Sequence, residues 1–583
     1  MPETPIEHPY ARLIALTQRA AMLAPQVGAT TMAKSSGQEF SIVDNASVAG
    51  AFAASMTHLA QNPGVVAAFY HSAALNAMNA MWSMALPGAY SAQDRRFKDD
   101  AWDTMLMPKL AKETHVALEK AMNHLLSTLP EGSLDHQRTK FYTRQMLSAL
   151  SPSNSAALNP TALKKALTSG GASLLDGFEN LLEDLERGEG RLDITNTDRE
   201  AFEVGKDLAT TPGQVVYQND LMQLIQYEPL TEKQNKRPML FVPAWINKYY
   251  ILDMRPDNSL VRHLVEQGHT VFVISWVNPT KAHADKSFED YMKDGPLAAL
   301  DAIEQATGER EANILGFCIG GILVTATLAW LAAKGDDRIK SATTLASMID
   351  FTDVGEIGVF IDDNRVRALE AHMAETGYLE NHHLQDMFSM LRENDLVWSS
   401  HVKHYLMGEK PSAFDLLYWN ADSTRLPRDM LLWYLTEIYL ANKLRQQGGL
   451  SMAGVPLDVS KIKTPMFVLA TKDDHIAPWK SVYPTTQIVG GPVEFVLGAS
   501  GHIAGVINPP RKKVKYGFWK ANIQPDTPAS WLEAAEYTQA SWWEIWTEWL
   551  GKHGGARKVK ARVPGDRELE VIEDAPGSYV GAH

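Results

Sequence analysis

Cysteine is almost absent from this sequence, because Cys318 is the single cysteine among 583 residues. A chain with one cysteine cannot form an intramolecular disulfide, which excludes the disulfide-rich secreted folds and fits a reducing compartment. A lone thiol is also a candidate nucleophile, since the thiolate form of cysteine attacks carbonyl carbons readily. The residues around Cys318 are therefore candidates for an active site.

Long apolar runs and excess positive charge are missing as well. The longest apolar runs, such as 322–333, are too short to cross a bilayer, and residues 1–8 lack the basic start and apolar stretch of a signal peptide. The formal net charge is −14, so a nucleic-acid partner is not expected. A hydrophobic content of 45% and a charged content of 21% are typical of globular proteins. We expect a soluble cytoplasmic protein without a transmembrane segment.

The pattern of apolar and polar residues changes near residue 200. Residues 1–200 contain helix-compatible segments and few strand-like runs, which predicts a helical N-terminal domain. In 201–583, short apolar runs alternate with helical segments, which predicts a mostly parallel sheet with helices on both faces. Two or three domains are the expected number for a chain of this length.

Within the N-terminal region, one helix-prone segment gathers large apolar side chains. They are Phe69, Tyr70, Leu75, Met78, Met81, Trp82, Met84 and Leu86, in the segment 65–90. A helix packed on its own core would explain them. A surface that meets a partner chain or an apolar particle would explain them too, because Met side chains adapt to varied surfaces. The sequence leaves both interpretations open.

Eight strands are expected in the second region. They are 213–217, 222–227, 239–242, 270–274, 313–315, 341–346, 466–470 and 493–497. An insertion of roughly 110 residues separates the last two strands from the others, and we interpret about 351–440 as a cap over the site. A cap excludes water, which matters to an enzyme that passes an acyl group to something other than water.

A nucleophile elbow is predicted where the fifth of these strands ends. The residues Gly-Phe-Cys-Ile-Gly at 316–320 follow an apolar run and precede a helix-compatible segment that reaches about Ala333. The turn needs glycine two residues before and after the nucleophile, because neighbouring backbones approach closely there. A cysteine elbow after the fifth of eight strands predicts the α/β-hydrolase fold.

A base and an acid are expected after the last two strands. His502 follows the final strand closely and lies between Gly501 and Gly505, which makes it the candidate base for Cys318. The strand 466–470 leads into Asp473 and Asp474. Adjacent residues at a strand end point to opposite sides, so one of the two carboxylates is expected to face His502. The residue types alone do not say which. The neighbouring His475 is expected to be a packing or hydrogen-bonding residue.

Backbone amides are expected to stabilise the oxyanion of a tetrahedral intermediate. One is the amide of Ile319, directly after the nucleophile. The other is expected in the loop after the third strand, where Pro243 has no amide hydrogen and Ala244, Trp245 and Ile246 remain as candidates. We favour Trp245.

The C-terminal region is expected to end in a helix and a tail. In 541–550, four tryptophans lie at a spacing that places them on one helical face, which predicts a helix docked on the sheet. A membrane-surface anchor is the weaker alternative, because Glu544 and Glu548 are acidic. The basic, glycine-containing tail 552–560 is predicted to be flexible.

Several long motifs in this order resemble those of the polyhydroxyalkanoate synthases. They are Phe-Tyr-Thr-Arg-Gln at 141–145, Ser-Pro-Ser-Asn at 151–154, Ile-Asn-Lys-Tyr-Tyr at 246–250, the elbow at 316–321, Leu-Arg-Glu-Asn-Asp at 391–395, Asp-His-Ile-Ala-Pro-Trp at 474–479, and the run from Gly498 to Pro510. The likeness starts near Arg95, and the family pattern selects Asp474 over Asp473. The length and the ending Ala-Pro-Gly-Ser-Tyr-Val at 575–580 resemble class I enzymes, which act on short-chain substrates.

The resemblance implies a cytoplasmic acyltransferase at the surface of polyester granules. It implies polymerisation of (R)-3-hydroxyacyl-CoA, here 3-hydroxybutyryl-CoA, onto a growing polyester chain through a triad of Cys318, His502 and Asp474, with no cofactor and no metal. It also implies a homodimer and granule-associated helper proteins. A cysteine thioesterase or an intracellular polyester depolymerase of the same fold is the alternative, since either would use the same triad. A structural granule protein with a relic site is the least favoured interpretation.

Overall fold

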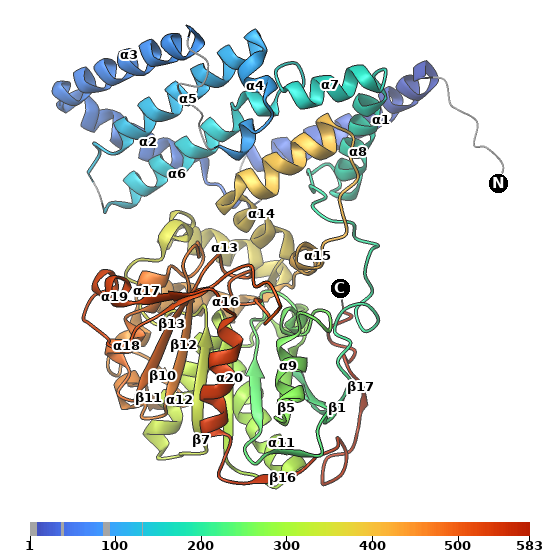
Figure 1. Ribbon diagram of the computed structural model, residues 1–583, viewed down its shortest axis with the longest axis vertical. Coiled ribbons are helices and arrows are strands. Elements are labelled where there is room, and N and C mark those ends of the chain that lie inside the picture. The colour runs from blue at the N-terminus through green and yellow to red at the C-terminus, as the bar shows by residue number, and fades with distance from the viewer. Residues whose placement is uncertain (1–8, 36–39, 86–93, 131, 583) are drawn as a thin grey trace. The chain divides into compact units, whose positions relative to one another are not determined.

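The computed structural model describes residues 9–35, 40–85, 94–130 and 132–582 (Figure 1). The chain forms two compact units: the helical unit, 1–198 with 383–413, and the hydrolase unit, 199–382 with 414–583. The boundary near residue 200 lies where the pattern of apolar residues changes from helical segments to alternating strands and helices. The predicted second domain, 201–583, is interrupted, however, because 383–413 from the cap insertion belongs to the helical unit.

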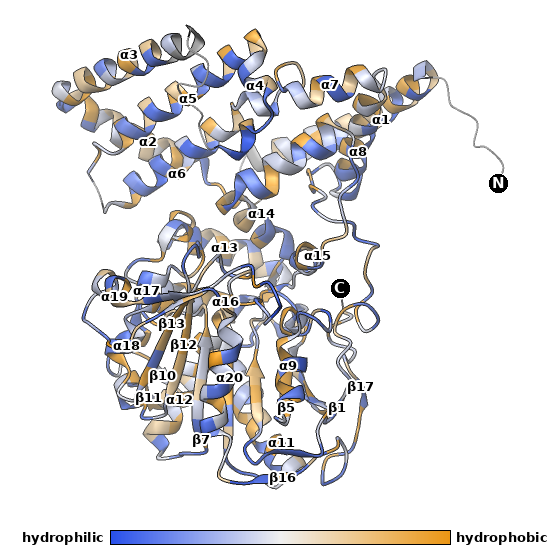
Figure 2. Ribbon diagram, viewed as in Figure 1, coloured by the Kyte–Doolittle hydropathy of each residue, from blue (hydrophilic) through white to orange (hydrophobic). Residues whose placement is uncertain are grey.

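The helical unit is built from helices that begin at recognisable capping residues. The Asn159 side chain accepts hydrogen bonds from the amides of Thr161 and Ala162, and Pro160 occupies the first helical position, where no amide is needed. The helices are α1 (Pro9–Ser35), α2 (Asn45–Gln61), α3 (Pro63–Ala85), α4 (Ala101–Thr104), α5 (Leu106–Leu126), α6 (Leu134–Ala149), α7 (Pro160–Thr168) and α8 (Ala172–Arg187). Both hydrophilic and hydrophobic residues colour α5 and α6 in Figure 2, as expected of helices with one buried face.

Large apolar side chains of α3 face solvent. Tyr70, Leu75, Met78 and Trp82 are all exposed, and Tyr70 and Trp82 expose about two thirds of their area, 67% and 65%. A helix packed on its own core therefore does not account for these four. Phe69 is half-buried, and the side chains of Met81, Met84 and Leu86 lie outside the described residues.

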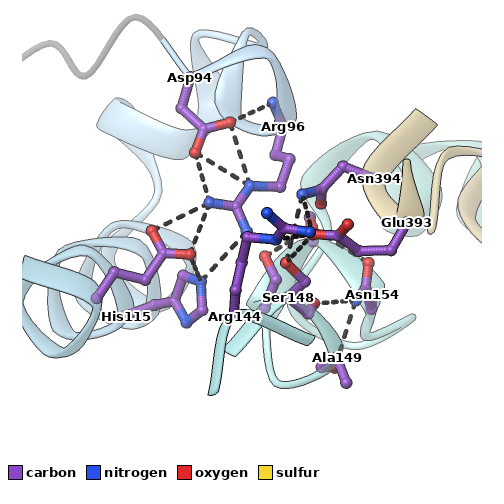
Figure 3. A network of polar contacts seen from close by, with 12 residues as sticks. Asp94, Arg96, His115, Arg144, Ser148, Ala149, Asn154, Glu393 and Asn394 are labelled. Atoms are coloured by element: carbon purple, nitrogen blue, oxygen red, sulfur yellow. Dashed lines mark hydrogen bonds and ion pairs between the residues drawn. The ribbon is translucent and has the colours of Figure 1, made fainter. Parts of the chain in front are cut away.

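The segment 383–413 is held in the helical unit by buried polar groups (Figure 3). Ser148 of α6 donates to the Glu393 carboxylate at 3.1 Å, and Arg144 lies 3.3 Å from the same carboxylate. Further along, Tyr405 donates to the fully buried Asp184 of α8 at 2.5 Å. Two π-helical turns, η7 (Asn394–Trp398) and η8 (His401–Leu406), carry this segment across α6 and α8.

The hydrolase unit contains one large mixed sheet, with parallel strands at its centre and antiparallel strands at both edges. Its strand order is β15-β14-β13-β12-β7-β6-β4-β5-β2-β1-β17. The eight predicted strands are all present: β1 (Gly213–Gln218), β2 (Met222–Tyr227), β4 (Met239–Val242), β5 (Val271–Trp276), β6 (Ala312–Phe317), β7 (Ile339–Leu345), β12 (Met466–Thr471) and β13 (Val493–Gly498). From β5 to β13 the pairs are parallel, and their buried apolar runs are typical of a sheet covered on both faces.

Short antiparallel strands that the sequence patterns did not predict extend both edges. They are β14 (Phe518–Lys520) and β15 (Glu536–Thr538) beside β13, and β17 (Glu573–Asp574) beside β1. The basic tail is also more ordered than predicted. β16 (Lys558–Lys560) pairs antiparallel with β3 (Lys233–Asn235), so the prediction of a flexible tail is wrong at these residues. A strand of two or three residues is too short to show an alternation of apolar and polar side chains. Such strands are defined only by the backbone hydrogen bonds to their neighbours.

The tryptophan helix packs on the sheet as predicted. In α20 (Trp542–His553), the four tryptophans are buried in one cluster with apolar residues of α9 (Leu260–Glu266) and the central strands. Trp546 is fully buried, and its indole donates to the Thr343 hydroxyl of β7 at 2.9 Å. The membrane-surface alternative for this helix is therefore wrong. Every helix in the described part of the chain is too short or too polar to span a bilayer.

The rest of the hydrolase unit includes helices between the strands and the two remaining parts of the cap. The helices are α10 (Phe288–Met292), α11 (Ala298–Thr307), α12 (Ile319–Lys334), α17 (Trp479–Val482), α18 (Thr485–Ile488) and α19 (Pro528–Ala534). The cap contributes α13 (Asp363–Thr376), α15 (Asp415–Ala421), α16 (Arg428–Trp433) and the π-helix η9 (Tyr434–Leu440), with β8 (Tyr378–Leu379) paired to β9 (Leu426–Pro427). The helix α14 (Asn381–Leu391) crosses from one unit into the other.

Candidate active site

Cys318 lies at a sharp turn between β6 and α12. Its backbone has φ 55° and ψ −125°, a conformation that costs a non-glycine residue free energy and is found at nucleophile elbows. The Cys318 amide donates to the Leu345 carbonyl on β7 at 2.9 Å, which fixes the turn to the sheet. The structure thus has the strand, turn and helix that the sequence predicts around this thiol.

Glycines on both sides of Cys318 allow the close packing of the elbow. A Cβ on Gly320 would lie 2.2 Å from the Val242 carbonyl oxygen, and a Cβ on Gly316 would lie 2.5 Å from the Gly321 Cα. Real Cβ atoms do not approach backbone so closely. Gly320 is therefore required because the loop after β4 crosses directly over the start of α12.

His502 and Asp474 form a buried pair after β13 and β12. The His502 Nδ1 lies 2.7 Å from the Asp474 Oδ2. The other carboxylate oxygen accepts from the amides of Ile476 and Ala477 at 2.8 and 2.9 Å, and Thr471 donates its hydroxyl to Oδ2 at 3.0 Å. These donors stabilise an ionised carboxylate, which in turn holds Nδ1 protonated and leaves Nε2 for the sulfur.

The charges of the site shift the pKa values of this pair. Burial disfavours the charged imidazole, but the Asp474 carboxylate and the Cys318 sulfur outweigh that penalty and raise the pKa of His502 to about 10. Burial also disfavours the Asp474 carboxylate, yet His502 and the amides of Ala477 and Ile476 lower its pKa overall. The Phe317 ring stacks on the imidazole at a centroid distance of 5.5 Å. His502 thus holds a proton readily beside the thiol.

The two candidate aspartates have different surroundings. Asp474 is buried against His502, whereas the side chain of Asp473 is exposed. This is the arrangement expected where successive residues leave a strand on opposite sides. The structure therefore brings Cys318, His502 and Asp474 together and leaves Asp473 apart from them.

The proposed oxyanion donors lie on either side of the elbow. Ile319 is the first residue of α12, and Trp245 lies in the loop after β4, whose Pro243 carbonyl also approaches Gly320. Within the described residues, neither of these two amides donates a hydrogen bond to a protein acceptor. Both are therefore available for a ligand, although the same holds for Ala244 and Ile246.

Two cap tyrosines that the sequence patterns did not single out also lie close to the thiol. Burial raises the pKa of Tyr434 and of Tyr439, and the Cys318 sulfur raises both further. Both come from the π-helix η9. Residues five apart nearly share a face of a π-helix but not of an α-helix, so a periodicity of 3.6 could not group them. The available signal was the aromatic content of the segment 430–444 at the end of the predicted cap.

Family models match most of the chain from residue 93 to residue 509. The model described as "Poly-beta-hydroxybutyrate polymerase (PhaC) N-terminus" matches 93–264, and the one described as "alpha/beta hydrolase fold" matches 237–509. The second match agrees with the observed sheet and with the predicted fold class.

Curated relatives are similar over an even longer stretch. A poly(3-hydroxyalkanoate) polymerase of Methylorubrum extorquens is 48% identical over 84% of this chain and 80% of its own length. The chain belongs to the poly(3-hydroxyalkanoate) polymerase family. The corresponding polymerase subunit of Cupriavidus necator is 42% identical over 86% of both chains, and poly(3-hydroxyalkanoate) polymerase 1 of Ectopseudomonas oleovorans is 38% identical over 84% of this chain and 87% of its own. Members of this polymerase family are acyltransferases, as the motif resemblance implies.

Solved structures add little to this assignment. A hydrolase from Pseudomonas aeruginosa PA01 is 14% identical and covers 50% of this chain and 92% of its own, with a TM-score of 0.31, which by itself is too low to establish a common fold. Residues 1–92 lie outside both matched family models.

Proposed function

We propose that this chain polymerises (R)-3-hydroxyacyl-CoA into a polyester and releases CoA, with Cys318 as the nucleophile, His502 as the base and Asp474 as the group that orients it. The observation that carries the proposal is the buried Asp474–His502 pair beside the single cysteine, in a member of the polymerase family. The names of the matched family model and relatives supply the substrate class.

In the first half-reaction, the acyl group moves from CoA to the enzyme. His502 Nε2 takes the proton of the Cys318 thiol, and the sulfur attacks the thioester carbonyl carbon. The amides of Ile319 and Trp245 stabilise the oxyanion. The carbon–sulfur bond to CoA then breaks, and the leaving thiolate takes the proton back from His502. One thioester replaces another, so this exchange is close to isoenergetic.

In the second half-reaction, the enzyme-bound thioester becomes an ester. His502 has given its proton to CoA, and the acylated sulfur carries no charge that would raise the pKa of His502, so the imidazole stays neutral and can serve as a base. It deprotonates the 3-hydroxyl of another 3-hydroxyacyl unit, whose oxygen attacks the acyl-Cys318 carbonyl. The Cys318 thiolate leaves and recovers the proton. Ester formation from a thioester is downhill, so the cycle needs neither a metal nor a redox cofactor.

The finer points of the proposal concern substrate length, assembly and location. The family description of poly-beta-hydroxybutyrate and the class I likeness of the tail favour 3-hydroxybutyryl-CoA as the substrate. An insoluble product favours a protein that works in the cytoplasm at the surface of a polyester granule. We include a homodimer and granule-associated proteins among the expected partners on the family resemblance alone.

Two incubations, one with (R)-3-hydroxybutyryl-CoA and one with added polyester, separate synthesis from hydrolysis. With (R)-3-hydroxybutyryl-CoA, we expect CoA release together with growing turbidity from polymer. A thioesterase would release CoA and soluble 3-hydroxybutyrate without turbidity. A depolymerase would instead release soluble acid from added polyester. Either of these two results would overturn the proposal.

A further inference from the structure

The loop that carries Trp245 is bonded along its length to one segment of the cap. Asn247 and Ser423 form an isolated antiparallel bridge, and the Thr424 amide donates to the Ile246 carbonyl at 3.2 Å. The Thr424 hydroxyl donates to the Trp245 carbonyl at 2.5 Å. Residues 419–424, which we call the clamp segment, thus follow the oxyanion loop 243–250 residue by residue.

A buried ion pair joins the same two segments. Lys248 Nζ lies 2.7 Å from Asp422 Oδ1, and the side chains expose only 4% and 13% of their area. Tyr250 donates its hydroxyl to the other oxygen of Asp422 at 2.9 Å, and the Trp419 indole donates to the Lys248 carbonyl at 2.7 Å. Burial and the Asp422 carboxylate both raise the pKa of Tyr250, so its hydroxyl stays protonated and continues to donate.

Stability alone is a weak reason for such a pair. Desolvating two charges consumes most of the Coulomb attraction between them, and buried ion pairs are best attested as devices that fix register. Here the register in question is that of the clamp segment against the oxyanion loop. A shift of one residue would separate Lys248 from Asp422 and move Thr424 away from the Trp245 carbonyl.

The bonds around Trp245 hold its peptide in place while leaving its amide N–H without a protein acceptor in the described residues. The Pro243 carbonyl accepts from the Trp276 indole at 2.9 Å, and the Trp245 carbonyl accepts from Thr424. The indole ring of Trp245 is buried against Trp276 and Tyr291. The peptide between Ala244 and Trp245 is thus held on both sides, while its N–H makes no bond to a protein acceptor in the described residues.

We propose that Lys248 and Asp422 are positioning residues for the oxyanion donor on the β4 loop. Their ion pair fixes the clamp segment, and the clamp segment aims the Trp245 amide at the thioester oxygen. The inference rests on the proposed function, because it assigns that amide a role in acylation. It also makes the oxyanion site depend on a part of the cap that lies about 180 residues later in the sequence.

The test uses butyryl-CoA, which can acylate Cys318 but has no 3-hydroxyl with which to elongate. For Asp422→Asn, we expect the acylation rate to fall about 10- to 100-fold at saturating substrate, with KM changed less than about twofold, since one oxyanion donor is worth about 100-fold or more. The infrared band of a [1-¹³C]butyryl-enzyme carbonyl is expected at a higher frequency than in the wild type, because a weakened hydrogen bond polarises the carbonyl less.

A matched control and a second variant keep the result interpretable. Asp336→Asn removes a carboxylate paired with Arg338 at 2.7 Å and similarly buried, 14% and 16%, but outside the site. It is expected to leave the acylation rate and the carbonyl band unchanged. If Asp422→Asn does not fold, Thr424→Val removes the hydroxyl bond to Trp245 directly and is expected to shift the band in the same direction.

The outcomes are distinct. A slower acylation with a shifted band in the clamp variants alone supports the positioning role. A lower unfolding temperature with an unchanged rate and band would show that the pair is merely structural and would overturn the inference. A wild-type protein that neither butyryl-CoA nor (R)-3-hydroxybutyryl-CoA acylates would refute the proposed function itself, and the inference with it.

Discussion

At the scale of single residues, the site combines three devices that depend on one another. The strained Cys318 backbone lifts the sulfur off the sheet, and Gly320 allows the β4 loop to cross at van der Waals distance. The Asp474 carboxylate holds the His502 ring and keeps its pKa high. A thiol suits this arrangement, because the acyl-enzyme keeps the reactivity of the incoming thioester.

Replacing the nucleophile tests its assigned role. We expect Cys318→Ala to form no acyl-enzyme and no polymer, since the chain has no second thiol. Cys318→Ser is expected to acylate slowly at best and to stop there, because its oxygen ester would be about as stable as the product ester. Mass spectrometry of the intact protein after incubation with (R)-3-hydroxybutyryl-CoA measures both. Polymer formation by the alanine variant would contradict the assignment.

The Asp474–His502 pair predicts a pH dependence of stability. The pKa of His502 is raised from 6.5 to about 10 in the folded protein, so the stabilisation is fully present below pH 6.5 and is lost as the pH rises through about 10. The loss is at most roughly 5 kcal/mol in the free energy of unfolding. For Asp474, whose folded pKa is lowered from 3.8, the contribution is present above pH 3.8 and is lost as the pH falls further.

Asp474→Asn isolates this contribution. Without the carboxylate, burial dominates, so the pKa of His502 is expected to fall toward or below 6.5 and the alkaline loss of stability to shrink. Urea unfolding between about pH 6 and 10.5 measures the difference. Asp473→Asn is the matched control, because its carboxylate is exposed and lies apart from His502. Equal pH profiles for wild type and Asp474→Asn would show that the pair does not set the pKa of His502.

At the scale of elements, strands and helices with a regular apolar pattern could be predicted from the sequence, and elements without such a pattern could not. The eight strands could be found because each is a buried apolar run beside a turn signal. The two-residue β17 and the three-residue β16 have no such pattern, and pairing with distant backbone creates them. The two tyrosines near Cys318 could not be grouped from the sequence, because they lie on the π-helix η9 and its period differs from the 3.6 residues of an α-helix.

The order of the strands predicted the nucleophile, the base and the loop that carries the acid. It could not decide which of the two adjacent aspartates in that loop is the acid. Asp473 and Asp474 are adjacent in sequence, and only the direction in which β12 ends decides which of them is buried. The same limit applies to the clamp segment. Nothing in residues 419–424 or 243–250 alone indicates that they pair, because the contact depends on how the cap folds back.

The final helix offers a test at this scale. Trp546→Ala in α20 is expected to lower the free energy of unfolding by about 3–5 kcal/mol, because it removes a fully buried ring from the face of the sheet. Trp546→Phe keeps an aromatic ring but loses the bond to Thr343, with an expected cost of about 1–2 kcal/mol. Urea unfolding measures both. Glu548→Ala on the exposed side is the control, and an effect as large as that of Trp546→Ala would contradict this packing.

At the scale of the whole molecule, the chain crosses between its two units more often than the sequence suggests. Residues 383–413 belong to the helical unit, although the residues before and after them belong to the hydrolase unit. The predicted cap of 351–440 is therefore shared between the units. Sequence patterns lead to the prediction of continuous domains. That 383–413 belongs to the helical unit becomes evident only when the partners of buried carboxylates such as Glu393 and Asp184 are known.

The last prediction concerns that exchanged segment. Glu393 is buried, accepts a hydrogen bond from Ser148 and lies 3.3 Å from Arg144 of α6 (Figure 3), so Glu393→Ala removes the acceptor of Ser148 and the carboxylate paired with Arg144. Because Arg144 is partly exposed, with 39% of its side chain accessible, the cost is discounted to roughly 2 kcal/mol. Local opening of 394–406 is expected to become about thirtyfold more frequent, while β6, β7 and β12 keep their protection. Amide hydrogen exchange read by mass spectrometry measures this.

Lys410→Ala, which removes an exposed pair with Glu183, is the control and is expected to change nothing. Unchanged exchange in Glu393→Ala would mean that other contacts, such as that between Tyr405 and Asp184, hold the segment without it.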